Sequence, residues 1–208
     1  MNQVLDSLST LIRILNSQGH NPATSGNYSH RDLQDQKLIW MSRSGVDKSE
    51  FQATDFLPLD LESKKLRENQ GAKPSDETSV HSAIYSMDSS INCVLHSHHP
   101  EMVILGELLK TQNSVGTLGN LELIKAFKGI KTHDAEVAFL SFSNTQDMEQ
   151  LSQEIKTTWA KQNKLPIVGV ILRRHGVYLW GDSVSSAKRS LEAAQSIAKF
   201  LLLERGLL

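Results

Sequence analysis

Two histidines separated by one residue are the most chemically suggestive feature of this 208-residue sequence. His96 and His98 follow the apolar run 91–95, which is typical of a buried strand. Because side chains at positions i and i+2 of an extended chain point to the same side, both imidazoles could bind one ion. Zinc requires imidazole nitrogens at about 2.0–2.1 Å. Two solvated loop histidines would give the same pattern, so a third ligand is needed to decide between these interpretations.

His175 is the candidate third ligand. It lies between the apolar runs 167–172 and 177–180, which predict two strands joined by a turn, and Gly176 permits close approach of other groups. Three histidines with one open coordination position describe a catalytic zinc site rather than a structural one. Manganese and iron also accept imidazole ligands, so the donor set does not identify the ion by itself. The histidines that we do not expect to be ligands are His20, His30, His99 and His133.

Three short loops combine hydroxyl or amide side chains with flexible backbone. They are Thr24-Ser25-Gly26-Asn27, Ser44-Gly45 and Pro74-Ser75. Such loops offer N–H and O–H donors to an anion, most often phosphate. Ordinary turns have the same composition, and the glycine spacing matches neither a P-loop nor a dinucleotide fingerprint.

Two carboxylates are candidates for acid–base chemistry. Glu77 follows the Pro74-Ser75 turn, and Glu122 lies in the first turn of a predicted short helix over 121–127. A carboxylate near a metal can act as a general acid or base, although spacing alone does not distinguish it from a solvated surface group. His81 lies one helical turn after Glu77, where it could belong to the core or could orient that carboxylate.

The elements that must position these residues mix helices and strands without a strict βαβ rhythm. Apolar spacing predicts helices over 4–15, 78–87, 100–109, 121–127, 148–159 and 183–204, and strands over 37–42, 91–95, 137–142, 167–172 and 177–180. One hairpin is expected where the last two strands meet. This pattern predicts an α/β protein whose sheet has substantial antiparallel pairing and is covered by helices.

The composition is that of a soluble globular protein, with 39% hydrophobic and 22% charged residues. Lys and Arg number 22 against 23 for Asp and Glu, so the basic excess of a nucleic-acid-binding protein is absent. The single cysteine, Cys93, excludes an intrachain disulfide and favours a reducing compartment. Neither a secretory leader nor a membrane-spanning segment is recognisable. We therefore expect one cytoplasmic domain over 1–208 with no nucleic-acid or membrane partner.

Five separated motifs occur in the order and rough spacing of the class II aldolase/adducin superfamily, which the sequence resembles over nearly its whole length. They are Thr24-Ser25-Gly26-Asn27, Ser44-Gly45, Lys73-Pro74-Ser75-Asp76-Glu77, His96-Ser97-His98 and His175-Gly176. One branch is most similar, the dehydratases that act on 5-methylthioribulose 1-phosphate in methionine salvage. The segments that resemble this branch are 73–78, 122–125 and 173–181.

The resemblance implies a three-layer α/β/α fold around a largely antiparallel sheet, and a homotetramer with active sites between subunits. It also implies one zinc ion per subunit, held by His96, His98 and His175. Members of this branch convert 5-methylthioribulose 1-phosphate to 2,3-diketo-5-methylthiopentyl 1-phosphate. We therefore expect a small-molecule sugar phosphate as the substrate.

The same resemblance assigns roles to the loops and carboxylates. Glu122 matches the acid–base carboxylate of the family, and Glu77 matches the carboxylate beside the metal in aldolase relatives. The residues expected to contact the sugar phosphate are Asn27, Ser44, Gly45, Ser75 and Glu77.

Two other functions remain open from the sequence. A sugar-phosphate aldolase or 4-epimerase, acting for example on fuculose or ribulose phosphates, would share the metal and phosphate residues and would cleave a C–C bond. A non-catalytic binding module similar to adducin would lack the metal histidines, whereas this chain retains all three.

Overall fold

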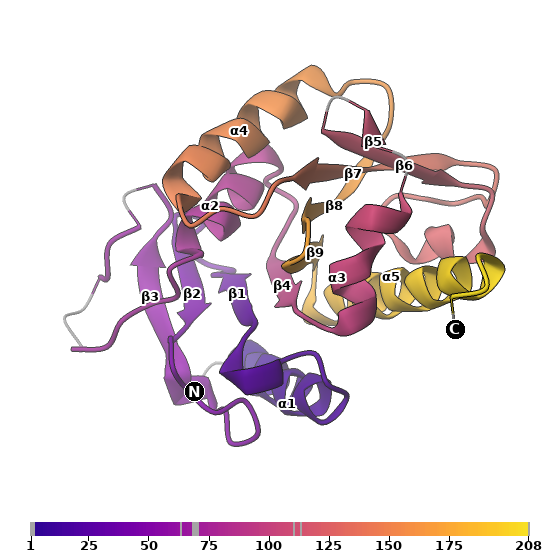
Figure 1. The fold of residues 1–208 in the computed structure, drawn as a ribbon. Coiled ribbons are helices and arrows are strands. Elements are labelled where there is room, and N and C mark those ends of the chain that lie inside the picture. Colours follow the sequence, from indigo (N-terminus) through magenta and orange to yellow (C-terminus); the bar gives the residue numbers. More distant parts are fainter. Residues whose placement is uncertain (1–2, 63, 68–70, 110, 113, 208) are drawn as a thin grey trace.

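A nine-stranded sheet forms the centre of the computed structural model, which describes residues 3–62, 64–67, 71–109, 111–112 and 114–207. The strand order is β3-β2-β1-β4-β9-β8-β7-β6-β5 (Figure 1). The strands are β1 (Asn27–Arg31), β2 (Leu38–Ser42), β3 (Phe56–Asp60), β4 (Cys93–Ser97), β5 (Thr111–Gln112), β6 (Val115–Gly119), β7 (Glu136–Phe142), β8 (Ile167–Leu172) and β9 (Gly176–Gly181). Every neighbouring pair is antiparallel except β7 and β8, which are parallel.

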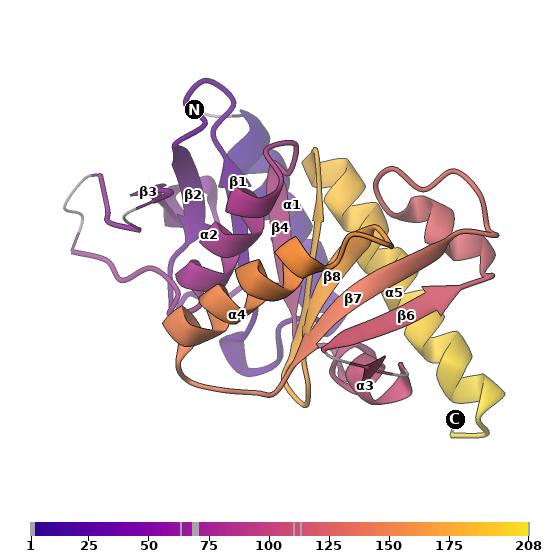
Figure 2. The ribbon, with the colours of Figure 1, turned by 90° about the horizontal axis from the view of Figure 1, so that it is seen from above.

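Helices cover both faces of this sheet (Figure 2). They are α1 (Gln3–Ser17), α2 (Thr78–Met87), α3 (Pro100–Leu108), α4 (Met148–Lys161) and α5 (Val184–Glu204), with 3-10 helices η1 (Pro22–Thr24), η2 (Ala53–Asp55) and η3 (Glu122–Ala126). One hydrophobic cluster contains side chains of α1, α3 and α5, and the other contains side chains of α2 and α4. The predicted three-layer α/β/α architecture with a largely antiparallel sheet is therefore confirmed.

Strand β4 shows how side-chain alternation builds both layers at once. Cys93 and Leu95 pack in the cluster of α1, α3 and α5, whereas Val94 packs in the cluster of α2 and α4. Continuing this alternation, the side chain of His96 faces the α2 layer, and that of Ser97 faces the opposite layer. Each of these two side chains is fully buried.

Several sequence predictions were wrong in detail. Strand β1 was not expected, because its polar sequence Asn-Tyr-Ser-His-Arg lacks the alternation of a half-buried strand; all five residues are nevertheless buried. Strands β5 and β6 were also missed. The predicted short helix over 121–127 is the 3-10 helix η3, which begins at Glu122 with Leu121 at its N-cap position. Helix α4 extends to Lys161, beyond the predicted end at 159, and Asp147 is its N-cap residue.

Within the described residues, none of the helices has the length and apolar character that crossing a bilayer requires.

The predicted helix over 183–204 is confirmed, and Ser183 caps α5 by accepting from the Ser186 backbone amide. The predicted hairpin is also confirmed, because β8 and β9 pair antiparallel through the turn that carries His175.

Candidate metal centre and anion pocket

Four side chains from distant parts of the chain bring their ligand atoms within 4.8 Å of one another, so they could hold a metal ion. They are Glu77, His96, His98 and His175. His96 lies in β4, His98 follows it, and His175 lies in the turn between β8 and β9. Gly176 makes this convergence possible, since a Cβ at that position would lie 2.3 Å from the Ser97 carbonyl oxygen.

The ring orientations of two histidines are fixed from behind. His96 Nδ1 lies 3.0 Å from the Val177 carbonyl oxygen, which can only accept, so this nitrogen carries the proton. His175 Nδ1 lies 2.9 Å from Asn144 Oδ1. The Nε2 atoms therefore present lone pairs to the centre of the site.

The lone pairs of His96 and His175 face each other at short range. His96 Nε2 lies 2.8 Å from His98 Nε2 and 3.4 Å from His175 Nε2. Two unprotonated nitrogens repel at such distances unless a cation lies between them. Ligands about 2.0–2.1 Å from one tetrahedral ion would stand about 3.3 Å apart. The donor set thus fits a divalent metal.

Glu77 adds the negative charge to this cluster. Its carboxylate oxygens lie 3.1 Å from His96 Nε2 and 3.1 Å from His175 Nε2. Asn27 Nδ2 and the Tyr178 hydroxyl each donate to Glu77 Oε2 at 2.7 Å. The Tyr178 ring also stacks on the His96 imidazole, with centroids 3.8 Å apart.

Burial and hydrogen bonding keep both the Glu77 carboxylate and the imidazoles of His96 and His98 deprotonated at neutral pH. Burial alone would raise the pKa of Glu77, but the nearby His96 and His175 rings and the hydrogen bonds from Asn27 and Tyr178 hold it well below its usual range. Burial lowers the pKa of His96 to about 4 and that of His98 to about 3. At neutral pH, the neutral imidazoles of His96 and His98 therefore lie near an ionised carboxylate, which is the state that binds a cation.

A small pocket of about 150 Å³ adjoins the histidine cluster, and the three predicted loops meet there. Its lining residues are Thr24, Ser25, Gly26, Asn27, Arg43, Ser44, Gly45, Lys48, Ser75, Glu77 and His98. All five residues predicted to contact the sugar phosphate are among them. The loops are joined directly, because the Ser44 backbone amide donates to the Lys73 carbonyl at 3.0 Å. Gly45 has a φ of +75°, a conformation that favours glycine.

Two features of this pocket suit an anion. Ser25 Oγ is inaccessible to solvent and has no hydrogen-bond partner among the described residues. Arg43 and Lys48 bring positive charge to the lining, and the Lys48 ammonium is held by the carbonyls of Thr24 and Val46. The sequence analysis missed both cations, because they lie outside the quoted motifs, although each is next to or near Ser44-Gly45.

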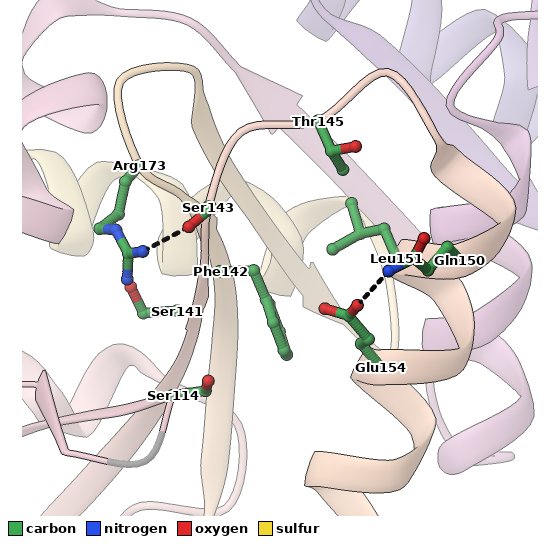
Figure 3. A pocket seen from close by; sticks show the side chains of 9 residues that line it. All are labelled: Ser114, Ser141, Phe142, Ser143, Thr145, Gln150, Leu151, Glu154 and Arg173. Carbon is green, nitrogen blue, oxygen red and sulfur yellow. Dashed lines mark hydrogen bonds between the residues drawn. The ribbon is translucent and has the colours of Figure 1, made fainter.

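A second, larger pocket of about 360 Å³ lies beside the ends of β7 and β8 (Figure 3). It does not contain the histidines. Arg173, on one side of it, donates to Ser143 Oγ at 2.6 Å. This hydrogen bond connects the turn before His175 to the segment that carries Asn144. It thereby supports the hydrogen bond between His175 and Asn144. Asn144 was not predicted, and its position after β7 gives no local signal of that role.

Glu122 is not part of the histidine cluster. Strand β6 runs antiparallel to β7 and leaves the sheet at Gly119, opposite Glu136, whereas the turn with His175 follows the other end of the sheet. The length of β7 separates these two ends by about 20 Å. Glu122 is 70% exposed and forms an ion pair with Lys125, and His133 Nδ1 lies 3.9 Å from it.

The remaining histidines divide between the interior and the surface. His20 is buried, and its Nδ1 lies 2.7 Å from Ser97 Oγ. His99 points away from the metal candidates and caps α3. His133 is about half exposed, whereas His30 is buried in β1.

The sequence matches the family model of the class II aldolase and adducin N-terminal domain over residues 6–202. Among solved structures, an L-fuculose 1-phosphate aldolase superposes with a TM-score of 0.77 at 19% identity, covering 99% of this chain and 88% of that one. The L-fuculose-1-phosphate aldolase from Thermus thermophilus gives a TM-score of 0.69 at 22% identity, covering 99% and 96%. These likenesses establish the fold.

Curated relatives are more similar in sequence. A methylthioribulose-1-phosphate dehydratase of Picosynechococcus sp. is 39% identical over 187 residues, which are 90% of this chain and 85% of the relative. One from Xanthomonas campestris pv. campestris is 36% identical over 182 residues, covering 88% and 80%. The chain therefore belongs to the class II aldolase and adducin family, on the side of its relatives named methylthioribulose-1-phosphate dehydratase.

Proposed function

We propose that this chain is a cytoplasmic, zinc-dependent dehydratase that converts 5-methylthioribulose 1-phosphate to 2,3-diketo-5-methylthiopentyl 1-phosphate in methionine salvage. The observation that supports this most strongly is that the candidate metal cluster and the anion pocket have two residues in common. Glu77 and His98 belong both to the cluster that could hold a metal and to the lining of the anion pocket. A phosphorylated sugar held by its phosphate would therefore extend directly over the metal.

His96, His98 and His175 would hold the ion, with Glu77 beside them. A bound divalent cation would polarise the C2 carbonyl and stabilise the negative charge that develops when the C3 proton is removed. The loops would bind the substrate phosphate through their backbone and hydroxyl donors, with Arg43 and Lys48 supplying charge. This anchoring would place C3 and C4 at a fixed position relative to the carboxylates.

The reaction removes the C3 proton and expels the C4 hydroxyl as water, and the resulting enol rearranges to the diketone. We assign the acid–base role to Glu122, which would take the C3 proton, protonate the departing hydroxyl, or do both in turn. Within one chain Glu122 lies at the wrong end of the sheet, so it must reach the metal centre of a second copy. The proposed enzyme is accordingly a homo-oligomer, and the family resemblance suggests a homotetramer.

Exposed apolar side chains support such an assembly. Phe200, Leu203 and Leu207, towards the end of the chain, are 46–62% exposed. Leu123, next to Glu122, is also exposed. A second copy covering Leu123 would also bring Glu122 out of solvent.

Turnover of synthetic 5-methylthioribulose 1-phosphate by the purified protein, after chelation and after zinc is restored, tests the proposal. We expect zinc-dependent formation of the diketone. A triose phosphate and an aldehyde would instead identify C–C cleavage and therefore an aldolase. Full activity after exhaustive chelation would contradict the metal's role, and the absence of bound metal together with inactivity would favour a binding module.

A further inference from the structure

A chain of buried hydrogen bonds leads from Glu77 away from the metal candidates into the interior. Asn27 Nδ2 donates to Glu77 Oε2 at 2.7 Å, and Asn27 Oδ1 lies 2.6 Å from His81 Nε2. On the other side of its ring, His81 Nδ1 lies 2.7 Å from Ser29 Oγ, which lies 2.8 Å from the Tyr85 hydroxyl. Asn27 and Ser29 belong to β1, and His81 and Tyr85 belong to α2.

The ionised carboxylate fixes the direction of every bond in this chain. Because Glu77 can only accept, the amide nitrogen of Asn27 must face it. The amide oxygen then faces His81 and needs a donor, so His81 Nε2 carries the proton. The bare Nδ1 of His81 in turn accepts from the Ser29 hydroxyl, which accepts from Tyr85.

An amide flip of Asn27 is the arrangement that this chain opposes. Flipped, the amide would turn its oxygen toward the Glu77 carboxylate and its N–H groups toward the protonated Nε2 of His81. Both contacts would be repulsive, and both lie in the interior, where His81 is fully buried. Burial also lowers the pKa of His81 to about 3, so this ring is neutral and keeps one donor and one acceptor.

We propose that His81 is a positioning residue that fixes the amide of Asn27, and thereby holds the Glu77 carboxylate against the three histidines and raises the affinity of the site for a divalent metal. This inference rests on the proposed function, since it assumes that the cluster of Glu77 and the histidines binds a metal. His81 contacts neither the ion nor the substrate and acts only through Asn27.

Two substitutions of the same imidazole give a matched test. In His81→Gln the side-chain nitrogen can occupy the place of Nε2 and still donate to Asn27, whereas the shorter side chain in His81→Asn replaces Nδ1 and cannot. We expect the zinc dissociation constant, measured by competition with a chromogenic chelator, to rise about 10–100-fold for His81→Asn and less than about threefold for His81→Gln. Equal weakening by the two variants would overturn the proposal.

A double-mutant cycle tests whether the effect passes through Asn27. In an Asn27→Ala background, His81→Asn should change zinc affinity by less than about twofold, because no amide is left to orient. Additive losses would contradict the proposed route. Val80→Ala removes a buried apolar side chain of the same helix, so it should lower the melting temperature without changing zinc affinity.

The tautomer of His81 can be read in the metal-free protein by long-range ¹H–¹⁵N correlation spectroscopy. We expect the neutral tautomer with the proton on Nε2, and a proton on Nδ1 would overturn the inference. Failure of the wild-type protein to bind zinc would reject the proposed metal centre. By contrast, zinc binding that is indifferent to His81→Asn would reject only the positioning role.

Discussion

The two ends of the central sheet differ in how far their candidate functional side chains are buried and hydrogen-bonded. At the end that carries His96, His98 and His175, His96 is fully buried and the other two rings are partly buried. His96 and His175 are also held from behind by hydrogen bonds to further protein groups. At the opposite end Glu122 is 70% exposed and has only Lys125 and His133 as recorded ionic partners among the described residues. In the proposed enzyme, the first end would be complete within one chain, whereas the second would need a second copy.

This difference indicates where each part of the chemistry is prepared. Holding neutral imidazoles beside an ionised carboxylate needs burial and fixed hydrogen bonds, which a single chain supplies through its sheet and α2. An acid–base group must meet the substrate, so it can remain on the surface until a second copy covers it. The following predictions test this contrast, starting with the largest expected effect.

Replacing His96 with Ala should abolish the function of the histidine end. His96 is the central ring of the cluster, within 3.4 Å of the other two imidazoles and 3.1 Å from Glu77. We expect bound zinc to fall below about one tenth of an equivalent and turnover to fall at least about 10³-fold, because the lost cation stabilises charge by several kcal/mol. Elemental analysis and a turnover assay measure both. Retained zinc with normal turnover would exclude His96 as a ligand.

Glu122→Gln should affect the opposite end alone. Turnover is expected to fall about 10²–10⁴-fold, the usual contribution of a general acid or base, while zinc content stays at the wild-type level. Loss of zinc in this variant would mean that Glu122 has a structural role, and full turnover would reject its acid–base assignment.

A mixture of the two inactive variants tests whether the metal and Glu122 of one active site come from different chains. If each active site takes its metal from one chain and its Glu122 from another, hybrid oligomers of His96→Ala and Glu122→Gln contain some complete sites. Activity should then reappear after joint refolding or subunit exchange. Mixtures that stay inactive, despite demonstrated subunit exchange, would place both groups in the same chain.

The histidine end was largely predictable because its signal is local. Alternation in an extended chain requires His96 and His98 to share a face, and a glycine after His175 signals a close approach. The partners that hold these rings were not predictable. The Val177 carbonyl oxygen and Asn144 meet them only through strand pairing, and neither type of residue is unusual at its position.

Strand β1 shows a second limit of the sequence. Two of its polar residues form hydrogen bonds beside the candidate site, Asn27 with Glu77 and Ser29 with His81. The strand therefore lacks the apolar alternation by which strands are recognised in a sequence. Glu122 shows a third limit. Its residue type predicted a role, but spacing within one chain could not indicate that this side chain lies at the opposite end of the sheet from the metal candidates.

The buried imidazoles predict a pH dependence of stability for the metal-free protein. Burial lowers the pKa of His81 to about 3 and that of His96 to about 4, whereas both rings take up a proton near pH 6.5 when unfolded. Between these values the unfolded chain binds more protons, so stability falls as the pH is lowered from about 7 toward 4. At pH 5 the two residues together should have removed about 4 kcal/mol, since each contributes about 1.5 pH units of differential protonation.

Urea unfolding in the presence of a chelator, repeated across this pH range, checks the expectation. His81→Gln should flatten the dependence by about one proton, or about 1.4 kcal/mol per pH unit. His133→Gln removes a half-exposed imidazole at the other end of the sheet and serves as the control. A pH dependence unchanged by His81→Gln would mean that this ring is not held neutral in the folded protein.

The smallest expected effect comes from Asn144→Ala, which removes the acceptor of the His175 Nδ1–H hydrogen bond. His96 is oriented by a backbone carbonyl that no side-chain substitution removes, whereas His175 depends on an exposed amide held in place through Ser143 and Arg173 (Figure 3). Because water can replace this amide at the surface, zinc affinity should fall only about tenfold. Thr145→Ala, one residue further along, should leave it unchanged. A loss as large as that of His96→Ala would show that the metal centre depends on this exposed amide as strongly as on the ring of His96.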